Sequence, residues 1–543
     1  MSSSHGQESA GRACAWPEFD VRRFGAVGDG RSLATAAINQ ALLAAEAAGG
    51  GTVVVPAGDY LCHSIQLRSH VTLHLGAGAT LVAADPPSPG EAGGYDAPEE
   101  GPVNLHQDFG HSRFRNSLIW GEHLDGVTIE GPGCIYGRGL SRGNGRKAMP
   151  VGVVGPQPPG HLPDVLEADG PVPSEGEPVT SGPFGYPHPS DTLPRGVGNK
   201  AIALRACRRV LVRDVTILHG GHFAVLATGC DHVTLDHLLI DTNRDGIDID
   251  GCANVRISRC SVNSPWDDAI CVKSSFGLGH LRPVEAVTIS DCFVSGFVEG
   301  TLLDGTRRPE VRHRGGPIGR IKLGTEGSGG FRTIAISNCV FDSCRGLALE
   351  QVDGAGLEQV VVTNLTMRQV MNAPIFIRLG GRLRAPGAET PGRAGRIAIS
   401  QVCAHLAVPD HGIFIAGLAG HPVTDVHLDG IQIFACGGAP ASTVNREVAE
   451  MVRDYPEPYL FGPLPAWGLY VRHAARIRVR NLSLHGDRPD PRPAVHLEDV
   501  DASDVTGLRV SGDAGVTRWT LIQVRGLRVR DSDGWTDEGP PVP

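Results

Sequence analysis

The chain has few aromatic residues, no excess of basic residues and no long apolar segment. Phe, Trp and Tyr make up 5% of its 543 residues, and 49 Lys and Arg stand against 59 Asp and Glu, a formal charge of -10. This acidic balance gives no support to nucleic acid or an anionic membrane as a partner. Without an apolar run long enough to cross a bilayer, we expect no membrane association.

Paired cysteine motifs are also missing. The 13 cysteines are scattered and odd in number, so at least one has no disulfide partner. We expect buried thiols that pack as small apolar side chains, which suits a reducing compartment. The first twenty residues, MSSSHGQESAGRACAWPEFD, lack the apolar core of a secretory signal. The chain as written is therefore expected to be cytoplasmic, or secreted or periplasmic if a signal was removed.

Short strand-like segments recur along most of the chain. RRVLVRDVTI, DHVTLDHLLI and ANVRISRCSV carry their first valines at Val210, Val233 and Val255, about 22 residues apart. A period of this length built from strands is typical of a β-solenoid. The pattern predicts an all-β fold, a right-handed parallel β-helix over roughly residues 60–530, with loops inserted where the later spacings lengthen.

The ends and one long segment depart from this repeat. Residues 33–50, LATAAINQALLAAEAAGG, predict an amphipathic helix that caps the N-terminal end of the solenoid. We expect residues 1–19 to be disordered or poorly ordered, and residues 20–543 to form a single domain. A segment rich in Pro and Gly at about 141–198 predicts a loop insertion. It is either a lid over a site or a flexible loop with no role at a site.

The repeat also predicts which polar side chains lie together. Twelve residues after each anchor valine stand, on four successive coils, His222, Asp245, Asp267 and Glu299, with Asp268 beside Asp267. Equivalent positions on neighbouring coils lie about 4.8 Å apart. Carboxylates that close raise one another's pKa, which indicates either acid/base chemistry or a bound cation.

A pair of carboxyl groups in unequal protonation states can hydrolyse a glycosidic bond. The protonated one donates to the leaving oxygen, and the ionised one activates water or attacks the sugar. Crowding gives a reason for one of them to stay protonated near neutral pH. The long flank of a solenoid suits a polymeric or branched substrate.

Several motifs resemble those of glycoside hydrolase family 28, the polygalacturonase and rhamnogalacturonan hydrolase family with a pectin-lyase-like β-helix. The resemblance covers nearly the whole chain. FGAVGDGRSLATAAINQAL and GGGTVVVPAGDYL are similar to the usual start of this β-helix superfamily. NRDGID (Asn243–Asp248) and DDAICVKS (Asp267–Ser274) resemble the family's Asn-Thr-Asp motif and its paired aspartates.

The resemblance implies an inverting hydrolase that needs no metal or other cofactor. Asp267 would be the general acid, and Asp245 and Asp268 would hold and activate the water. Two departures stand out, because Arg244 replaces the usual threonine and Ile318 falls where the family's Gly-His-Gly motif has its histidine. The variant motifs resemble the bacterial branch that acts on rhamnogalacturonan-type or other pectic oligosaccharides, and they imply exo action on an acidic carbohydrate.

Uronate carboxylates require basic partners, and the arginine guanidinium can donate two parallel hydrogen bonds to one carboxylate. We expect eight residues to contact substrate: His222, Arg244, Lys273, Glu299, Arg320, Lys322, Glu326 and Arg378. Trp266 could stack on a sugar face or pack into the wall.

Three alternatives share the predicted fold. A calcium-dependent polysaccharide lyase would use the carboxylates to bind Ca²⁺. A glycosidase could act on a different glycan that contains rhamnose or uronate. A non-catalytic carbohydrate-binding solenoid fits least well, because a binder gains little from carboxylates that repel one another.

Overall fold

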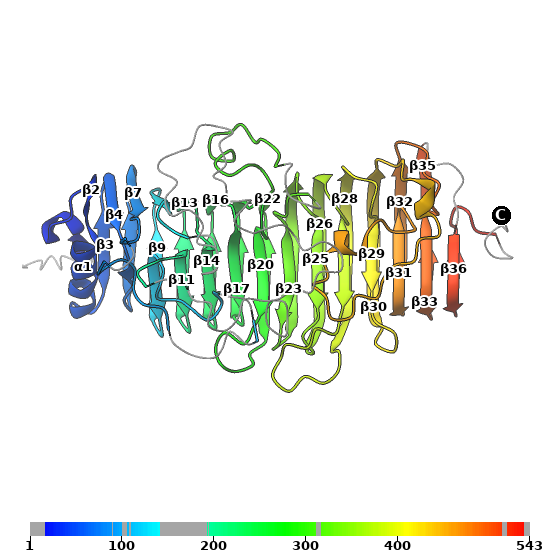
Figure 1. Ribbon diagram of the computed structural model, residues 1–543, viewed down its shortest axis with the longest axis horizontal. Coiled ribbons are helices and arrows are strands. Elements are labelled where there is room, and N and C mark those ends of the chain that lie inside the picture. The colour runs from blue at the N-terminus through cyan, green and yellow to red at the C-terminus, as the bar shows by residue number, and fades with distance from the viewer. Residues whose placement is uncertain are drawn as a thin grey trace, which may run out of the picture.

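The computed structural model describes residues 17–88, 91–99, 106–107, 110–141, 193, 195–310, 316–512 and 519–536. The predictions for residues 1–16 and for most of the insertion at 141–198 lie outside these residues. Within them, the named strands pair in parallel, and each coil stacks on the next to form an elongated parallel β-helix (Figure 1). The predicted fold class is confirmed.

Three parallel sheets form the walls of the β-helix. The first sheet comprises β5 (Ile65–Gln66), β8 (Ile119–Glu122), β11 (Lys200–Arg205), β14 (Phe223–Thr228), β17 (Asp245–Asp250), β20 (Ile270–Ser274), β23 (Ile321–Gly327), β25 (Leu347–Gln351), β27 (Ile375–Leu379), β29 (Ile413–Ala416), β31 (Leu469–Ala475), β33 (Val495–Asp501) and β36 (Trp519–Arg525). The second sheet comprises β2 (Asp29–Leu33), β4 (Gly58–Cys62), β7 (Ala79–Ala83), β10 (Cys134–Tyr136), β13 (Thr216–Leu218), β16 (Leu239–Asp241), β19 (Ser261–Asn263) and β22 (Phe293–Ser295).

The third sheet runs the length of the solenoid. It comprises β1 (Glu18–Asp20), β3 (Gly51–Val55), β6 (Val71–Leu75), β9 (Asp125–Glu130), β12 (Arg208–Arg213), β15 (Asp231–Asp236), β18 (Ala253–Ser258), β21 (Val284–Ser290), β24 (Phe331–Asp342), β26 (Gly356–Val370), β28 (Arg393–Leu406), β30 (Val423–Ala435), β32 (Arg478–Gly486), β34 (Asp504–Thr506) and β37 (Arg528–Arg530). The long strands β24 to β32 also continue the second sheet, because β22 pairs with the end of β24 and β35 (Arg509–Gly512) with the end of β32.

The interior is a stack of aliphatic side chains. Val210, Val233, Val255 and Val287 pair on successive rungs of the third sheet, as the repeat predicts, and all four are buried. Since side chains alternate between the two faces of a strand, every second residue packs inward and its neighbours face outward. The described cysteines are free thiols and most are buried, in keeping with the expected role.

The helix α1 (Thr35–Ala47) covers the N-terminal end, where Figure 1 shows it in blue. It buries Ile38, Leu42 and three alanines, so the predicted cap is confirmed. Glu18 and Phe19 belong to β1, which pairs with β3, and they are therefore not poorly ordered as predicted. Coils also begin before residue 60. Among the described helices, none has the length and apolar character needed to traverse a membrane.

The outward face of the first sheet is covered by a segment from late in the chain. Residues 436–468 join β30 to β31 and contain two short 3-10 helices, η3 (Ala441–Thr443) and η4 (Pro458–Phe461); a third, η1 (Val21–Phe24), lies near the N-terminus. Tyr455 from this segment contacts Lys322 of β23, and Glu457 contacts Arg320, directly before that strand. Arg320 and Lys322 are buried under this cover.

Candidate active site

Three aspartates meet at the corner where the chain enters the first sheet. Asp245 is the first residue of β17, and Asp267 and Asp268 lie just before β20, separated from it by Ala269. The Gly246 amide donates to the Asp268 carbonyl at 3.0 Å, which fixes the two coils against each other. One carboxyl oxygen of each aspartate lies within 4.8 Å of the others. The cluster predicted from the coil register therefore exists.

The side chains stacked on Asp245 from the neighbouring coils form a column. The register of this column differs from the prediction by one residue. Phe223, not His222, pairs with Asp245, and Asp268, not Asp267, lies on its rung on the other side. The reason is the corner between β16 and β17, which is one residue shorter than the corresponding corners before β14 and β20. Counting from the anchor valines is therefore correct along the strands and fails across this corner.

Glu299 does not belong to the column. It lies in a segment between β22 and β23 that replaces the short corner of earlier coils, and its carboxylate contacts His219 Nδ1 at 2.5 Å. His222 is buried with its ring against Phe223, the centroids 4.4 Å apart. Burial, followed by the positive charges of Arg244 and Lys200, holds the pKa of His222 well below its usual value. Its imidazole is thus neutral at neutral pH.

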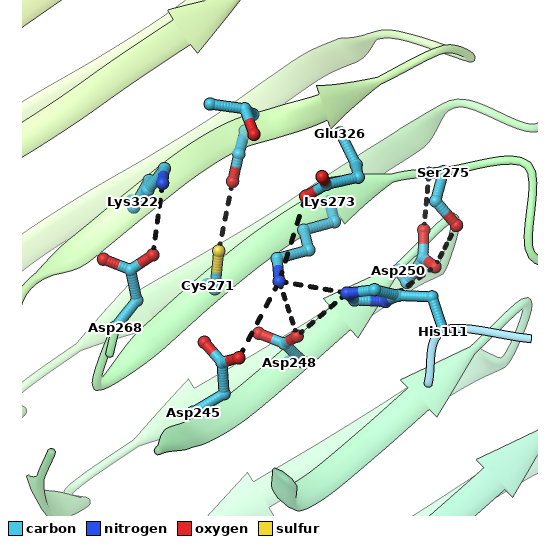
Figure 2. A network of polar contacts seen from close by, with 12 residues as sticks. His111, Asp245, Asp248, Asp250, Asp268, Cys271, Lys273, Ser275, Lys322 and Glu326 are labelled. Carbon is cyan, nitrogen blue, oxygen red and sulfur yellow. Dashed lines mark hydrogen bonds and ion pairs between the residues drawn. The ribbon is translucent and has the colours of Figure 1, made fainter. Parts of the chain in front are cut away.

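Asp268 faces two cations one rung further along, Lys322 in β23 and Arg320 directly before that strand. Arg320 Nε lies 2.8 Å from one carboxyl oxygen and Lys322 Nζ 3.3 Å from the other (Figure 2 shows the lysine contact). Arg320 also binds Glu457 with both terminal nitrogens, and Lys322 donates to the Tyr455 hydroxyl at 2.5 Å. Arg320 and Lys322 therefore lie beside the cluster as predicted, and they orient Asp268.

Lys273 is the centre of the second group of contacts. Figure 2 shows its Nζ between Asp248 at 3.0 Å, His111 Nε2 at 3.1 Å, Glu326 at 3.9 Å and Asp245 at 4.0 Å. Burial, and then the charges of Asp248 and Asp267, raises the pKa of Asp245 well above its usual range despite the nearby ammonium. The surroundings of Asp245 therefore favour its protonated form.

Asp267 has the opposite environment. Arg244 Nη2 lies 3.1 Å from its Oδ2. Burial alone would raise the pKa of Asp267, but Arg244, and after it Lys273 and Lys322, brings that pKa below its usual value. The Asp267 side chain is 23% exposed, against 4% for Asp245 and 3% for Asp268. Asp267 is thus ionised in the free protein and is the most accessible of the three.

Two predicted contact residues lie away from the aspartates. Glu326 reaches Lys273 but pairs more closely with Arg384, at 2.9 Å. Arg378 donates to the carbonyls of Gly417 at 2.8 Å and Glu450 at 2.6 Å, and burial lowers its pKa to about 10. The structure does not bring Arg378 to the cluster, and its guanidinium ties the covering segment 436–468 to the first sheet.

Several residues of the site were missed by sequence reasoning. Asp248 and Asp250 alternate with Ile247 and Ile249 in β17, so period-2 alternation would have marked them as outward-facing and adjacent to the site. His111, Tyr455 and Glu457 carry no such signal. They come from segments more than a hundred residues away in the chain, and only the folded structure brings them in.

The three aspartates offer enough oxygen atoms to touch a divalent cation. Calcium, however, takes six to eight oxygen ligands, and this cluster is bordered by Arg244, Lys273, Arg320 and Lys322. These guanidinium and ammonium groups already supply the positive charge that a cation would bring. The donor set fits carboxylate acid/base chemistry better than a calcium centre.

Comparison with known proteins bears on the fold and on distant relationships. One family description, "Rhamnogalacturonase A/epimerase, pectate lyase-like", matches residues 19–87, and "Right handed beta helix region" matches residues 200–384. A probable polygalacturonase from Vitis vinifera is 26% identical over 370 residues, which is 64% of this chain and 60% of that protein. The mannuronan C5-epimerase AlgE3 of Azotobacter vinelandii is 63% identical over only 67 residues, 12% of this chain and 4% of its own length.

Among solved structures, the family 28 exopolygalacturonase of Yersinia enterocolitica superposes with a TM-score of 0.59 at 17% identity. The match covers 97% of this chain and 79% of that one. This likeness shows the shared fold. The chain spans 60% of the Vitis vinifera protein and 4% of AlgE3, so the match to each concerns part of that protein. The chain is a right-handed parallel β-helix whose first part matches a pectate lyase-like family description, and it is a distant homologue of polygalacturonases.

Proposed function

We propose that the protein is a glycoside hydrolase that cleaves pectic oligosaccharides or polysaccharides from the chain end, at galacturonosyl or rhamnogalacturonan-type linkages. The observation that carries the proposal is the cluster of three carboxyl groups, two of which have surroundings of opposite effect. The surroundings of Asp245 raise its pKa and those of Asp267 lower its pKa, and the two carboxyl groups lie less than 5 Å apart. Such a division of roles is what acid/base hydrolysis of a glycoside requires.

The burial of each group assigns its role. Asp245 and Asp268 are almost fully buried, and oxygens less than 4.8 Å apart can both contact one water at about 2.7 Å each. We assign them the role of holding the attacking water. Asp267 is the most exposed of the three, so the glycosidic oxygen of a bound sugar can reach its carboxyl group. Asp267 is accordingly the general acid.

Asp267 has to gain a proton before it can act, and Arg244 controls that step. A uronate carboxylate on the substrate competes with Asp267 for the Arg244 guanidinium. When Arg244 turns to the substrate, Asp267 loses its main stabilising charge and takes the proton of Asp245. The O–H bond of Asp245 breaks as that of Asp267 forms. Arg244, the residue that departs from the family motif, thus becomes the selector for acidic sugars.

Hydrolysis then restores the starting state. Asp267 gives its proton to the glycosidic oxygen as that bond to the anomeric carbon breaks, and water forms the new bond. Asp245, now ionised, accepts the proton from the water. One water is consumed per bond cleaved, and the enzyme ends with Asp245 protonated and Asp267 ionised, as at the beginning.

The stereochemical outcome is a separate expectation. The carboxyl oxygens are closer than the roughly 6.5–9.5 Å usual for inverting enzymes. Inversion is nevertheless the outcome that the resemblance to the polygalacturonase family implies, and it is the outcome expected here. Proton NMR of the first product shows the anomer directly. A first product of retained configuration would contradict this expectation without affecting hydrolysis itself.

The direct test is incubation with polygalacturonate, rhamnogalacturonan and other rhamnose-linked oligosaccharides. Release of a saturated monosaccharide with new reducing ends supports the proposal. An unsaturated, ultraviolet-absorbing product that disappears on chelation would instead establish a calcium-dependent lyase. For Arg244→Gln we expect a loss of about 10- to 100-fold on de-esterified substrate, and a much smaller loss on the methyl ester. Equal losses on both would contradict the role given to Arg244.

A further inference from the structure

A basic groove lies on the outward face of the third sheet, near the C-terminal end of the solenoid. Its volume is about 330 Å³, and it is lined by Arg478, Val479, Arg480, Asp504, Thr506, Arg528 and Arg530. This volume falls at the lower end of the range for ligand pockets. Four guanidinium groups face one carboxylate in a chain whose formal net charge is -10. We call these residues the arginine groove.

The hollow follows from strand register. Arg478, Asp504 and Arg528 pair in one column, and Arg480, Thr506 and Arg530 in the next. Each column has long side chains on the outer rungs and a short one on the middle rung. At about 4.8 Å per rung, the two pairs of arginines lie roughly 10 Å apart across the hollow. An extended anionic chain laid along the groove would meet guanidinium groups at both ends.

Ion pairing separates the groove from its surroundings. Arginines of the same coils outside it are neutralised, since Arg476 binds Asp425 and Arg525 binds Asp501, at 2.7 Å and 2.6 Å. Within the groove only Arg528 has a carboxylate partner, Asp504, at 2.6 Å. In the part of the chain that the structure describes, Arg478, Arg480 and Arg530 form no ion pair, and all three are exposed. Their guanidinium groups are therefore accessible to an anionic ligand from solvent.

The groove is remote from the three aspartates. Six rungs of the first sheet separate β20 from β33, whose coil carries Asp504 and Thr506 (Figure 1). The groove therefore lies about 30 Å farther along the axis, and on a different sheet. A monosaccharide bound at the aspartates cannot touch it, whereas a long chain can occupy it and keep its ends close to the enzyme. Such docking raises the effective concentration of chain ends without any change in the chemistry.

From this geometry we propose that the arginine groove is a second binding site, which docks the carboxylates of a polyuronate chain. A guanidinium group matches a carboxylate in shape and charge. Guanidinium groups without a carboxylate partner stand on both outer rungs of the groove, and this arrangement favours a ligand with repeated carboxylates over one with a single carboxylate. The identity of the polymer rests on the proposed function, whereas binding of a polyanion at the groove does not. Removal of two unpaired arginines therefore weakens binding of long uronates and leaves short ones unaffected.

The test compares two double variants in the full chain. Arg478→Gln with Arg530→Gln removes two unpaired groove charges and leaves Arg528 on Asp504. Arg476→Gln with Arg525→Gln removes the same charge from neighbouring, paired positions and is the matched control. Calorimetry with polygalacturonate is expected to show at least tenfold weaker binding for the groove variant and less than a twofold change for the control. Thermal unfolding midpoints of both variants check that the solenoid is intact.

Three results would overturn the proposal. These are equal losses in both double variants, no loss in the groove variant, and binding of heparin or duplex DNA at the groove at least as tight as binding of polygalacturonate. If polygalacturonate is cleaved, KM for the polymer should rise in the groove variant while kcat and KM for trigalacturonate do not change. If no substrate is cleaved but the groove variant still loses polygalacturonate binding, the docking site stands and the proposed hydrolase fails.

Discussion

The outward faces of the first and third sheets carry charges in the same geometry but in different surroundings. On both, side chains from successive coils form columns at one strand spacing. On the first sheet the segment 436–468 and residues near His111 cover the columns, so Arg320, Lys322, Asp245 and Asp268 are all buried. On the third sheet comparable pairs such as Arg476 with Asp425 remain about half exposed.

The difference shows that cover, more than spacing, decides what a column of charges can do. Exposed pairs shift the pKa of their members modestly because water screens them. Buried groups lose that screening, so neighbouring carboxyl groups end with opposite shifts, as Asp245 and Asp267 do. The same fold thus provides a catalytic centre on one face and an open binding surface on another.

The largest effect should come from Asp267→Asn. Asparagine cannot donate a proton to the glycosidic oxygen, so turnover is expected to fall at least 10²- to 10⁴-fold, measured by release of reducing sugar. Asp425→Asn, an exposed aspartate of the third sheet, is the control and should retain full activity. Activity close to that of the unmodified protein in the Asp267 variant would disprove the role of the covered cluster.

Next in size is the effect of Arg320→Gln on stability. This change removes the cation that Asp268 and Glu457 share, although Lys322 still lies beside Asp268 and Arg345 beside Glu457. Loss of one partner of a buried ion pair costs up to about 3–5 kcal/mol. Chemical denaturation followed by circular dichroism should show a clearly lower midpoint. If the variant has the same denaturation midpoint as the unmodified protein, the covered face is more hydrated than its burial indicates.

A smaller effect is expected from Glu350→Gln, seen as a change in pH dependence. Burial raises the pKa of Glu350 to about 7, although Lys322 and Arg320 oppose the shift. Between its usual value of 4.5 and about 7, the folded protein holds a proton that the unfolded chain releases. Stability therefore falls as pH rises through this window, by at most about 3 kcal/mol.

Glutamine at position 350 removes this titration. Unfolding midpoints measured at pH 4.5 and pH 7 should differ less in the variant than in the unmodified protein. An identical difference in the two proteins would show that Glu350 does not carry the proton.

The smallest effect should follow Arg476→Gln on the third sheet. Its pair with Asp425 is short, at 2.7 Å, but both side chains are exposed, and such pairs contribute about 0–1 kcal/mol. The denaturation midpoint should be nearly unchanged, and raising the salt concentration should reduce any loss. A loss equal to that of Arg320→Gln would remove the contrast between the two faces.

Much of the fold was predictable from sequence because strand periodicity is a local property. The anchor valines, the helix at 35–47 and the two aspartate motifs all lie in short segments whose pattern fixes their direction. The column through Asp245 was predicted with an error of one position, since the length of a corner is not visible in the alternation of the strands that flank it. Glu299 was misplaced because a longer segment replaces that corner in its coil.

The sequence alone determined that the chain stacks parallel coils and that Asp245, Asp267 and Asp268 meet on one flank. It did so because apolar alternation and repeat length specify which residues share a rung. Only the tertiary structure decided which aspartate keeps its proton. That depends on burial and on charges such as those of Arg244, Lys273 and Lys322, while Tyr455 and Glu457 reach the site from a segment over a hundred residues away. Desolvation and Coulomb interactions are set by neighbours in space, and no local pattern in the sequence specifies them.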